Sequence, residues 1–381
     1  MRRSWAPDRA GARALHTPRV QAGGAAWVGD GEQNVGIGQA RLAQSAGMVL
    51  LGGARDGSSR AFSTPPVSIL PLRPRTGRVR AKMQGALALI KAQAALARGW
   101  PAHHRVFGHL DDDVWFSVNT TAYRRHATLR KILPSLPDAQ TQKHFIGNVG
   151  DRALVEAFRF YQVIRTLSAR WGRGITRDSR ILDFGCGWGR VLRFFLHDVP
   201  GPHLHGVDVW PLAIDLAHRT NPWCQFSVVP SLPPSDLPPG DFDLIYLYSV
   251  FSHLSEEAHD RWLTEFRRLL RPQGLLFATT WDREYIERCE RARQGGDTTG
   301  THTGSLPAFE ETAKWLAHYD RAGYCHSPVG GGAVLSSEFY GETCIPEAYV
   351  RRRWSDRFDV REFLHADGEW LWQNLIVAQK R

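Results

Sequence analysis

Residues 181–190, ILDFGCGWGR, carry the residue types best suited to hold a ligand. An apolar strand ends in an acid, then passes through three glycines at alternate positions into a new amphipathic segment. Glycine permits the tight turn that this spacing requires. The first N–H groups of the following helix then face whatever lies against the turn. We therefore expect a ligand to contact the backbone of Gly185, Cys186 and Gly187.

A second acid, Asp208, ends the next apolar strand, residues 204–208. An acid at the tip of that neighbouring strand can accept hydrogen bonds from both hydroxyls of a ribose. The alternative role for Asp208 is an ordinary cap of the helix predicted over residues 211–219. The two features together predict a cofactor that contains a nucleoside.

The pattern D-x-G-x-G-x-G differs from the G-x-G-x-x-G of dinucleotide sites, in which the pyrophosphate lies on the helix N-terminus. Asp183 stands two residues before the first glycine. Its charge would repel a pyrophosphate and would favour a cofactor that carries an ammonium group and no phosphate. This spacing favours a methyl donor over a nicotinamide.

Residues 181–190 resemble motif I of class I S-adenosylmethionine-dependent methyltransferases, and residues 207–209, VDV, resemble the acidic motif that follows it. The resemblance covers about residues 140–381. Within that family it is nearest to bacterial enzymes of glycan or secondary-metabolite pathways, through QKHFIG at 142–147, SVFSHLSEE at 249–257 and GETCIPEAYV at 341–350. It implies an α/β fold with a doubly wound, seven-stranded, mainly parallel, Rossmann-like sheet.

The resemblance also implies S-adenosylmethionine as cofactor and assigns its contacts. Asp183 would act on the ammonium group, directly or through water, or would only brace the turn. Many members bind the adenine amino group with an acid after the third strand, whereas here residues 230–234, PSLPP, hold none before Asp236. The backbone near Ser231 and Leu232 would have to serve. The expected cofactor contacts are Asp183, Gly185, Cys186, Gly187, Asp208, Val209, Ser231, Leu232 and Ser249.

In the family, the segment at residues 249–254 lines the floor of the site. His253 is the candidate general base, because imidazole accepts a proton near neutral pH. Its alternative role is a helix-start histidine bonded to the backbone. Arg190 could meet the cofactor carboxylate or pair with an acid, and Cys186 is expected to be a small spacer. Weaker substrate-pocket candidates are Tyr285, His302, His326, Glu338 and Tyr340.

The net charge of +10 is concentrated in the first 80 residues, which hold twelve arginines, no lysine and four acids. The remaining 301 residues are almost neutral, so we expect no nucleic-acid partner. The five cysteines are scattered, and no His or Cys spacing indicates a metal. We expect a reduced, cytoplasmic protein without a membrane segment.

Three regions are predicted along the chain. Residues 1–82 are expected to be a disordered basic tail, with a helix beginning at Met83 and a true start that could lie there. Residues 83–150 are a helical extension, and residues 151–381 are the methyltransferase domain. Within that domain, residues 281–345 are too long for a simple connection and predict an inserted cap. The cap is expected to contain helices at 283–293 and 309–322 and a hairpin at 334–344.

The predicted activity is methyl transfer to a small molecule or saccharide by in-line displacement. A nicotinamide-dependent oxidoreductase and a non-catalytic cofactor-binding module are the alternatives. The sequence leaves open the acceptor atom and the oligomeric state.

Overall fold

A computed structural model describes Gln84 and residues 106–296, 307–330 and 335–381. These residues lie within the compact unit Ile69–Arg381. The expected basic tail and the helix expected from Met83 lie outside the described residues, as does His302.

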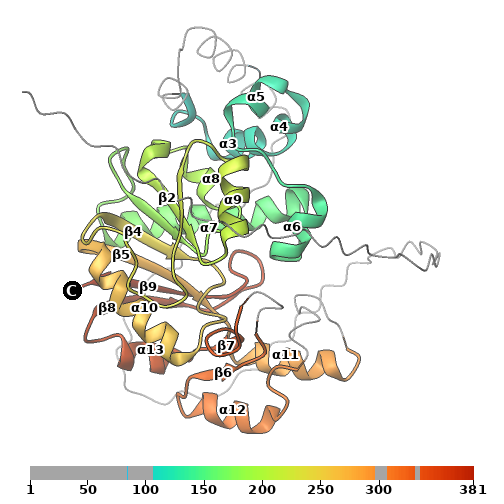
Figure 1. Cartoon of the computed structure of the whole chain (residues 1–381), viewed down its shortest axis with the longest axis vertical. Helices are drawn as coiled ribbons and strands as arrows, with labels where there is room; N and C mark the ends of the chain where they lie inside the picture. Colours follow the sequence, from blue (N-terminus) through green and yellow to red (C-terminus); the bar gives the residue numbers. More distant parts are fainter. Residues whose placement is uncertain (1–83, 85–105, 297–306, 331–334) are drawn as a thin grey trace, which may run out of the picture. The chain divides into compact units, whose positions relative to one another are not determined.

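A seven-stranded sheet organises this unit (Figure 1), in the order β3-β2-β1-β4-β5-β9-β8. Strands β1 to β5 are parallel, whereas β9 runs antiparallel to both β5 and β8. The strands are β1 (Ile181–Phe184), β2 (Leu204–Asp208), β3 (Gln225–Val228), β4 (Phe242–Leu247), β5 (Leu270–Thr280), β8 (Phe358–Leu364) and β9 (Asn374–Lys380). The predicted doubly wound, mainly parallel α/β sheet is confirmed. The order in which successive strands are added to the sheet reverses between β1 and β4, where such sheets bind ligands.

Both faces of the sheet are buried, as the continuous apolar run of β4 predicts. One face packs in a core that includes α7 (Gly150–Trp171), α8 (Leu192–Phe195) and α9 (Pro211–Thr220). The other face packs against α10 (Glu256–Leu269) and α13 (Glu347–Arg353). Ser255 is the N-cap of α10, since its hydroxyl accepts a hydrogen bond from the N–H of Ala258.

Within the described residues before β1, the helical extension contains α3 (Asp112–Asn119), α4 (Thr121–Arg125), α5 (Ala127–Ile132) and α6 (Ala139–Ile146), which are followed by α7. Apolar residues of the extension belong to the same hydrophobic core as α7 and the face of the sheet that α7 covers. The indole of Trp115 donates to the carbonyl of Phe194 at 3.0 Å, and the buried Arg193 donates to the carbonyl of Pro134 at 2.9 Å. These bonds hold the extension against α8, next to the glycine turn.

The insertion contains α11 (Arg283–Arg293), α12 (Thr312–Asp320), β6 (Cys325–Ser327) and β7 (Glu342–Cys344), which group together in Figure 1. Helix α11 matches its prediction. The predicted hairpin at 334–344 is wrong, because β7 pairs with β6, with Cys325 opposite Cys344. Helix α12 is shorter than predicted, since Phe309 and Ala322 at the expected ends have positive φ angles. The insertion has an apolar cluster of its own around Tyr285 and Phe309.

Two elements near the site also differ from their predictions. Residues 191–197 are expected to be helical, but α8 covers only Leu192–Phe195. The fifth strand is expected over residues 275–280 after a stop at 271–274, yet β5 begins at Leu270. Leu270 pairs with Phe242 and Leu275 with Leu244. The register between β4 and β5 therefore shifts between these two pairs, and residues 271–274 form an irregularity in β5.

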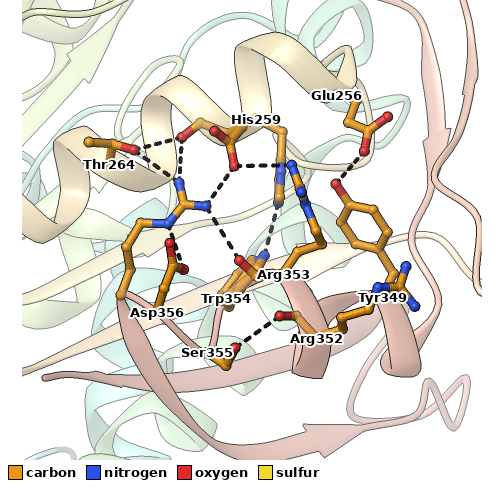
Figure 2. A network of polar contacts seen from close by, with 11 residues as sticks. Glu256, His259, Thr264, Tyr349, Arg352, Arg353, Trp354, Ser355 and Asp356 are labelled. Atoms are coloured by element: carbon orange, nitrogen blue, oxygen red, sulfur yellow. Dashed lines mark hydrogen bonds and ion pairs between the residues drawn. The ribbon is translucent and has the colours of Figure 1, made fainter.

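A polar network joins α10 to the chain around α13 (Figure 2). Arg357 donates to the carboxylate of Asp260 at 2.7 Å, and the Tyr349 hydroxyl donates to Glu256 at 2.6 Å. The buried indole N–H of Trp354 donates to Nε2 of His259 at 3.2 Å. Burial lowers the pKa of His259 to about 3, so this imidazole is neutral and serves as an acceptor. Among the described helices, none is long and apolar enough to cross a membrane.

Candidate functional site

A cavity of about 1860 Å³ opens at the carboxyl ends of β1, β2 and β4. Its walls come from the glycine turn after β1, from α6 and α7 of the N-terminal part, from the segment after β4, and from the insertion. Most of the predicted cofactor contacts line it: Asp183, Gly185, Cys186, Gly187, Asp208, Val209, Ser231 and Ser249. Leu232 is not among the described lining residues; it packs beside the apolar cluster that covers α10.

The glycine turn is held by two backbone hydrogen bonds to one carbonyl. The N–H groups of Gly185 and Cys186 donate to the carbonyl of Val207 at 2.8 and 3.0 Å. Gly185 has a φ of 75°, and a Cβ there would lie 2.5 Å from the side chain of Val250. Both the backbone angle and the close approach therefore require glycine. Cys186 is a buried thiol whose pKa is raised by burial, which agrees with a spacer role.

Asp208 connects the two predicted ligand elements. One carboxylate oxygen accepts a hydrogen bond from the N–H of Gly187 and the other from the N–H of Trp210, both at 3.0 Å. Helix α9 begins at Pro211 without a side-chain cap, so Asp208 is not its N-cap. Burial raises the pKa of Asp208, while the N–H groups of Trp210 and Gly187 oppose that shift. Carboxylates have up to four lone-pair sites, so Asp208 keeps acceptor capacity toward the cavity.

Asp183 is a buried carboxyl group at the base of the same turn. Burial raises its pKa to about 7; the neighbouring Tyr246 hydroxyl and Arg190 lower it, and the charge of Asp208 raises it further. A buried carboxyl that is only partly compensated attracts a cation, because a bound ammonium group would stabilise its ionised form. This electrostatic property fits the ammonium-bearing cofactor predicted above and disfavours a pyrophosphate.

Arg190 forms an ion pair with an acid and is not exposed to solvent. It is buried, and it donates to Glu156 at 3.1 Å and to the carbonyl of Ala153 at 2.9 Å. Its guanidinium also lies 5.3 Å from the ring centre of Tyr248, whose hydroxyl donates to Glu156. Glu156 lines the cavity from α7, so the N-terminal half of that helix supplies the acid of this charge pair to the site.

His253 lies in the cavity wall with its two ring nitrogens in different environments. Nδ1 is 2.9 Å from the carbonyl of Gly341, and because a carbonyl only accepts, Nδ1 carries the proton. Nε2 is 3.4 Å from the hydroxyl of Ser249. The imidazole stacks on Tyr340 at 4.9 Å, and the Glu342 carboxylate lies 3.7 Å from Nδ1. The geometry therefore directs the Nδ1 proton toward Gly341 and places Nε2 on the Ser249 side.

Ser249 has a positive φ of 60°, which is costly for a residue with a side chain. Its N–H donates to the Thr279 hydroxyl at 2.7 Å, and its own hydroxyl accepts from the amide of Gln373 at 3.0 Å. The carbonyl oxygen of that Gln373 amide is buried and has no hydrogen-bond partner among the residues that the structure describes, and Gln373 lines the cavity. Strained backbone of this kind often occurs at functional sites.

Three aromatic residues at the cavity rim have no site role in the sequence prediction. Phe145 of α6 stacks on Trp210 at 5.1 Å, and His144 lies 5.9 Å from the same ring. Phe145 also lies next to Gly187, so α6 covers the glycine turn. The QKHFIG resemblance at 142–147 marks this segment, but only the tertiary structure brings it to the turn.

The weaker cap candidates separate into two groups. Tyr340 lines the cavity against His253, whereas Tyr285 is buried beneath Trp281, to which it stacks at 4.2 Å. His326 bonds to the Thr343 hydroxyl at 2.8 Å, and burial, followed by the charge of His253, lowers its pKa to about 4. Glu338 is exposed and is not among the described residues of the cavity wall. In the described ranges no cluster of His, Cys, Asp or Glu could hold a metal ion.

Comparison with known proteins gives a family for the central part of this region. Residues 182–276 match the family described as "Methyltransferase domain". An uncharacterized protein from Rickettsia prowazekii is 32% identical over 103 residues, 26% of this chain and 41% of that protein. The phosphoethanolamine N-methyltransferase of Plasmodium falciparum is 27% identical over 124 residues, 30% of this chain and 46% of that enzyme. The chain thus spans less than half the length of either relative.

Among solved structures, an S-adenosylmethionine-dependent methyltransferase from Aquifex aeolicus is similar, with 15% identity and a TM-score of 0.38. The similarity covers 65% of this chain and all of that one. The family match covers β1, β2, β3, β4, α10 and most of β5, which include the glycine turn, Asp208 and His253. Residues 182–276 thus match the methyltransferase domain family, and they form most of the parallel part of the seven-stranded sheet.

Proposed function

We propose that the chain transfers a methyl group from S-adenosylmethionine to a small-molecule or saccharide acceptor. One observation carries this proposal: the cavity places the buried carboxyl group of Asp183 and the partly buried carboxylate of Asp208 on either side of a glycine turn. Asp208 would bind the ribose hydroxyls and Asp183 the ammonium group. The backbone of Gly185, Cys186 and Gly187 would contact the methionine and ribose parts between them.

For the adenine we propose apolar contact with Val209 and polar contact with the backbone at Ser231. The carbonyl of Ser231 already accepts a hydrogen bond from the indole of Trp262 at 3.0 Å. Leu232 would not contact the adenine directly. Its packing would instead hold the loop that carries Ser231 in position. Ser249 would form the wall of the site next to the transferred methyl group.

We further propose that His253 is the general base. The bound cofactor supplies an electrophilic methyl group, so the chain has to align the acceptor and remove its proton. Gly341 holds the proton of His253 on Nδ1, which leaves Nε2 free to accept one from the acceptor. Glu342, 3.7 Å from Nδ1, would stabilise the imidazolium that forms.

Calorimetric titration with S-adenosylhomocysteine and with NADH tests the cofactor assignment. We expect S-adenosylhomocysteine to bind and NADH not to compete, because two carboxylates face the turn. Tight binding of NADH at the glycine turn would instead support the oxidoreductase alternative.

Turnover is tested by S-adenosylhomocysteine release across a panel of phenols, amines and sugars. We expect release with at least one class, and a decrease of about 10²–10⁴-fold in kcat for His253→Gln with the cofactor affinity unchanged. Cofactor binding without release on any acceptor would support a non-catalytic module. The scattered and unpaired cysteines also lead us to propose a cytoplasmic location.

A further inference from the structure

We propose that the acceptor carries an oxyanion, a carboxylate or a phosphate, and that Arg288 binds it. This inference rests on the proposed methyl transfer and adds the chemical class of the substrate. Arg288 belongs to α11 in the insertion and lines the same cavity as Asp208 and His253. It is partly buried, and none of the described carboxylates lies within ion-pair distance of it.

Two aromatic rings hold the guanidinium of Arg288 in place. It lies 5.9 Å from the ring centre of Trp281 and 5.8 Å from that of Tyr285. Those rings stack on each other at 4.2 Å with an angle of 2° between their planes. A guanidinium beside aromatic rings keeps its in-plane N–H donors available, and its planar fork matches carboxylate and phosphate oxygens.

The acids nearest to Arg288 along the chain contact other residues. Glu290, two positions away, accepts a hydrogen bond from the side-chain amide of Gln294 at 3.4 Å. Asp282 caps α11 by accepting from the N–H of Tyr285. Glu284 and Glu287 are ion-paired with Arg291, the next arginine of this helix to line the cavity, at 3.6 and 3.9 Å. Arg291 is therefore compensated, whereas Arg288 presents a positive charge that the described residues leave uncompensated.

The wall that carries Arg288 is continuous with the wall that carries His253. Trp281 forms a bridge to Cys344, the last residue of β7, and its carbonyl accepts from the N–H of Ile345. The same segment begins with Gly341 and Glu342, which hold His253. An acceptor bound through its anion at Arg288 would therefore extend along β7 toward Nε2 of His253.

Ligand-observed NMR on the full chain can measure this preference with benzoate, phenyl phosphate and benzyl alcohol as probes. We expect the two acids to bind more than tenfold more tightly than the alcohol, with the tighter acid distinguishing a carboxylate from a phosphate. Arg288→Gln should abolish the preference, and Arg288→Lys should retain part of it, because lysine keeps the charge without the planar fork. The matched control Arg283→Gln removes a charge from the same helix outside the described cavity wall and should leave the preference unchanged.

Equal binding of acid and alcohol to the wild type would overturn the proposal, as would an acid preference that survives Arg288→Gln. All titrations are repeated with and without S-adenosylhomocysteine. Unaltered S-adenosylhomocysteine affinity in Arg288→Gln shows that the variant is folded with an intact cofactor site. Failure of the wild type to bind S-adenosylhomocysteine would contradict the methyltransferase proposal independently of the anion result.

Discussion

The backbone N–H of Gly187 donates a 3.0 Å hydrogen bond to the carboxylate of Asp208. The bond links the end of β2 to the turn after β1, so the two ligand elements form one rigid unit. Because Asp208 is already bonded to Gly187 and to Trp210, its orientation is set before a ligand arrives. Such preorganisation lowers the entropic cost of binding.

Asp208→Asn is expected to weaken S-adenosylhomocysteine binding at least tenfold, since the amide offers one acceptor oxygen where the carboxylate offers two. Isothermal titration calorimetry measures the effect. Asp215→Asn is the matched control, because Asp215 is exposed on α9. Unchanged affinity in Asp208→Asn would refute the ribose contact.

Asp183 should make the unfolding free energy fall as the pH rises from about 4 to 7. The folded protein retains this proton up to a pKa of about 7, whereas the unfolded chain releases it near 3.8. The folded state therefore binds more protons in this window, and stability decreases by about 1.4 kcal/mol per pH unit. Urea denaturation of wild type and Asp183→Asn, without ligand, should show this slope in the difference between their two pH profiles, because His259 contributes the opposite slope to both proteins below about pH 6.5. Parallel pH profiles would mean that Asp183 is already ionised in the folded protein.

His259 should produce the opposite pH dependence. Its folded-state pKa is about 3, whereas the unfolded imidazole protonates near 6.5. Stability is therefore lost as the pH falls from about 6.5 toward 3, again by about 1.4 kcal/mol per unit. In the same denaturation experiment, the difference between wild type and His259→Gln, which keeps an acceptor for Trp354, should show this loss, because Asp183 contributes equally to both proteins. His365→Gln is the control, because His365 is 70% exposed and should follow the wild type.

Gly185→Ala should destabilise the protein by about 1–3 kcal/mol, because the new Cβ would combine a positive φ with a contact to Val250. Gly174→Ala isolates the backbone effect: its φ is 71°, and its Cβ would meet nothing closer than 3.7 Å. Adding Val250→Ala to Gly185→Ala should remove the close contact. It should restore the part of the unfolding free energy lost to that contact, but not the part lost to the positive φ angle. Equal unfolding free energies for the two single glycine variants would show that the contact is unimportant.

Much of the sheet and the cofactor end of the site could be predicted from the sequence. Local patterns suffice there: the apolar runs of β1, β2 and β4, the alternate glycines, and the acids that end or follow the strands. The hairpin prediction fails for a physical reason. Residues 334–344 contain no local signal of their partner, and β7 pairs with β6, which lies about fifteen residues earlier in the chain.

The acceptor end of the site depends on contacts between distant segments. Arg288 could not be distinguished from its neighbouring arginines in sequence, because what separates it from Arg291 is the absence of a described acid partner. Phe145 reaches the glycine turn only because α6 folds over it.

The sequence by itself determined the class of sheet and the glycine turn proposed as the cofactor site, because strand periodicity, glycine spacing and the position of an acid are local properties. Only the tertiary structure decided which side chains surround that cofactor site. The tautomer of His253, the pairing of Arg190 with Glu156 and the cavity-facing charge of Arg288 arise from residues tens of positions apart along the chain. Long-range packing sets such contacts, and sequence patterns over a few residues do not encode them.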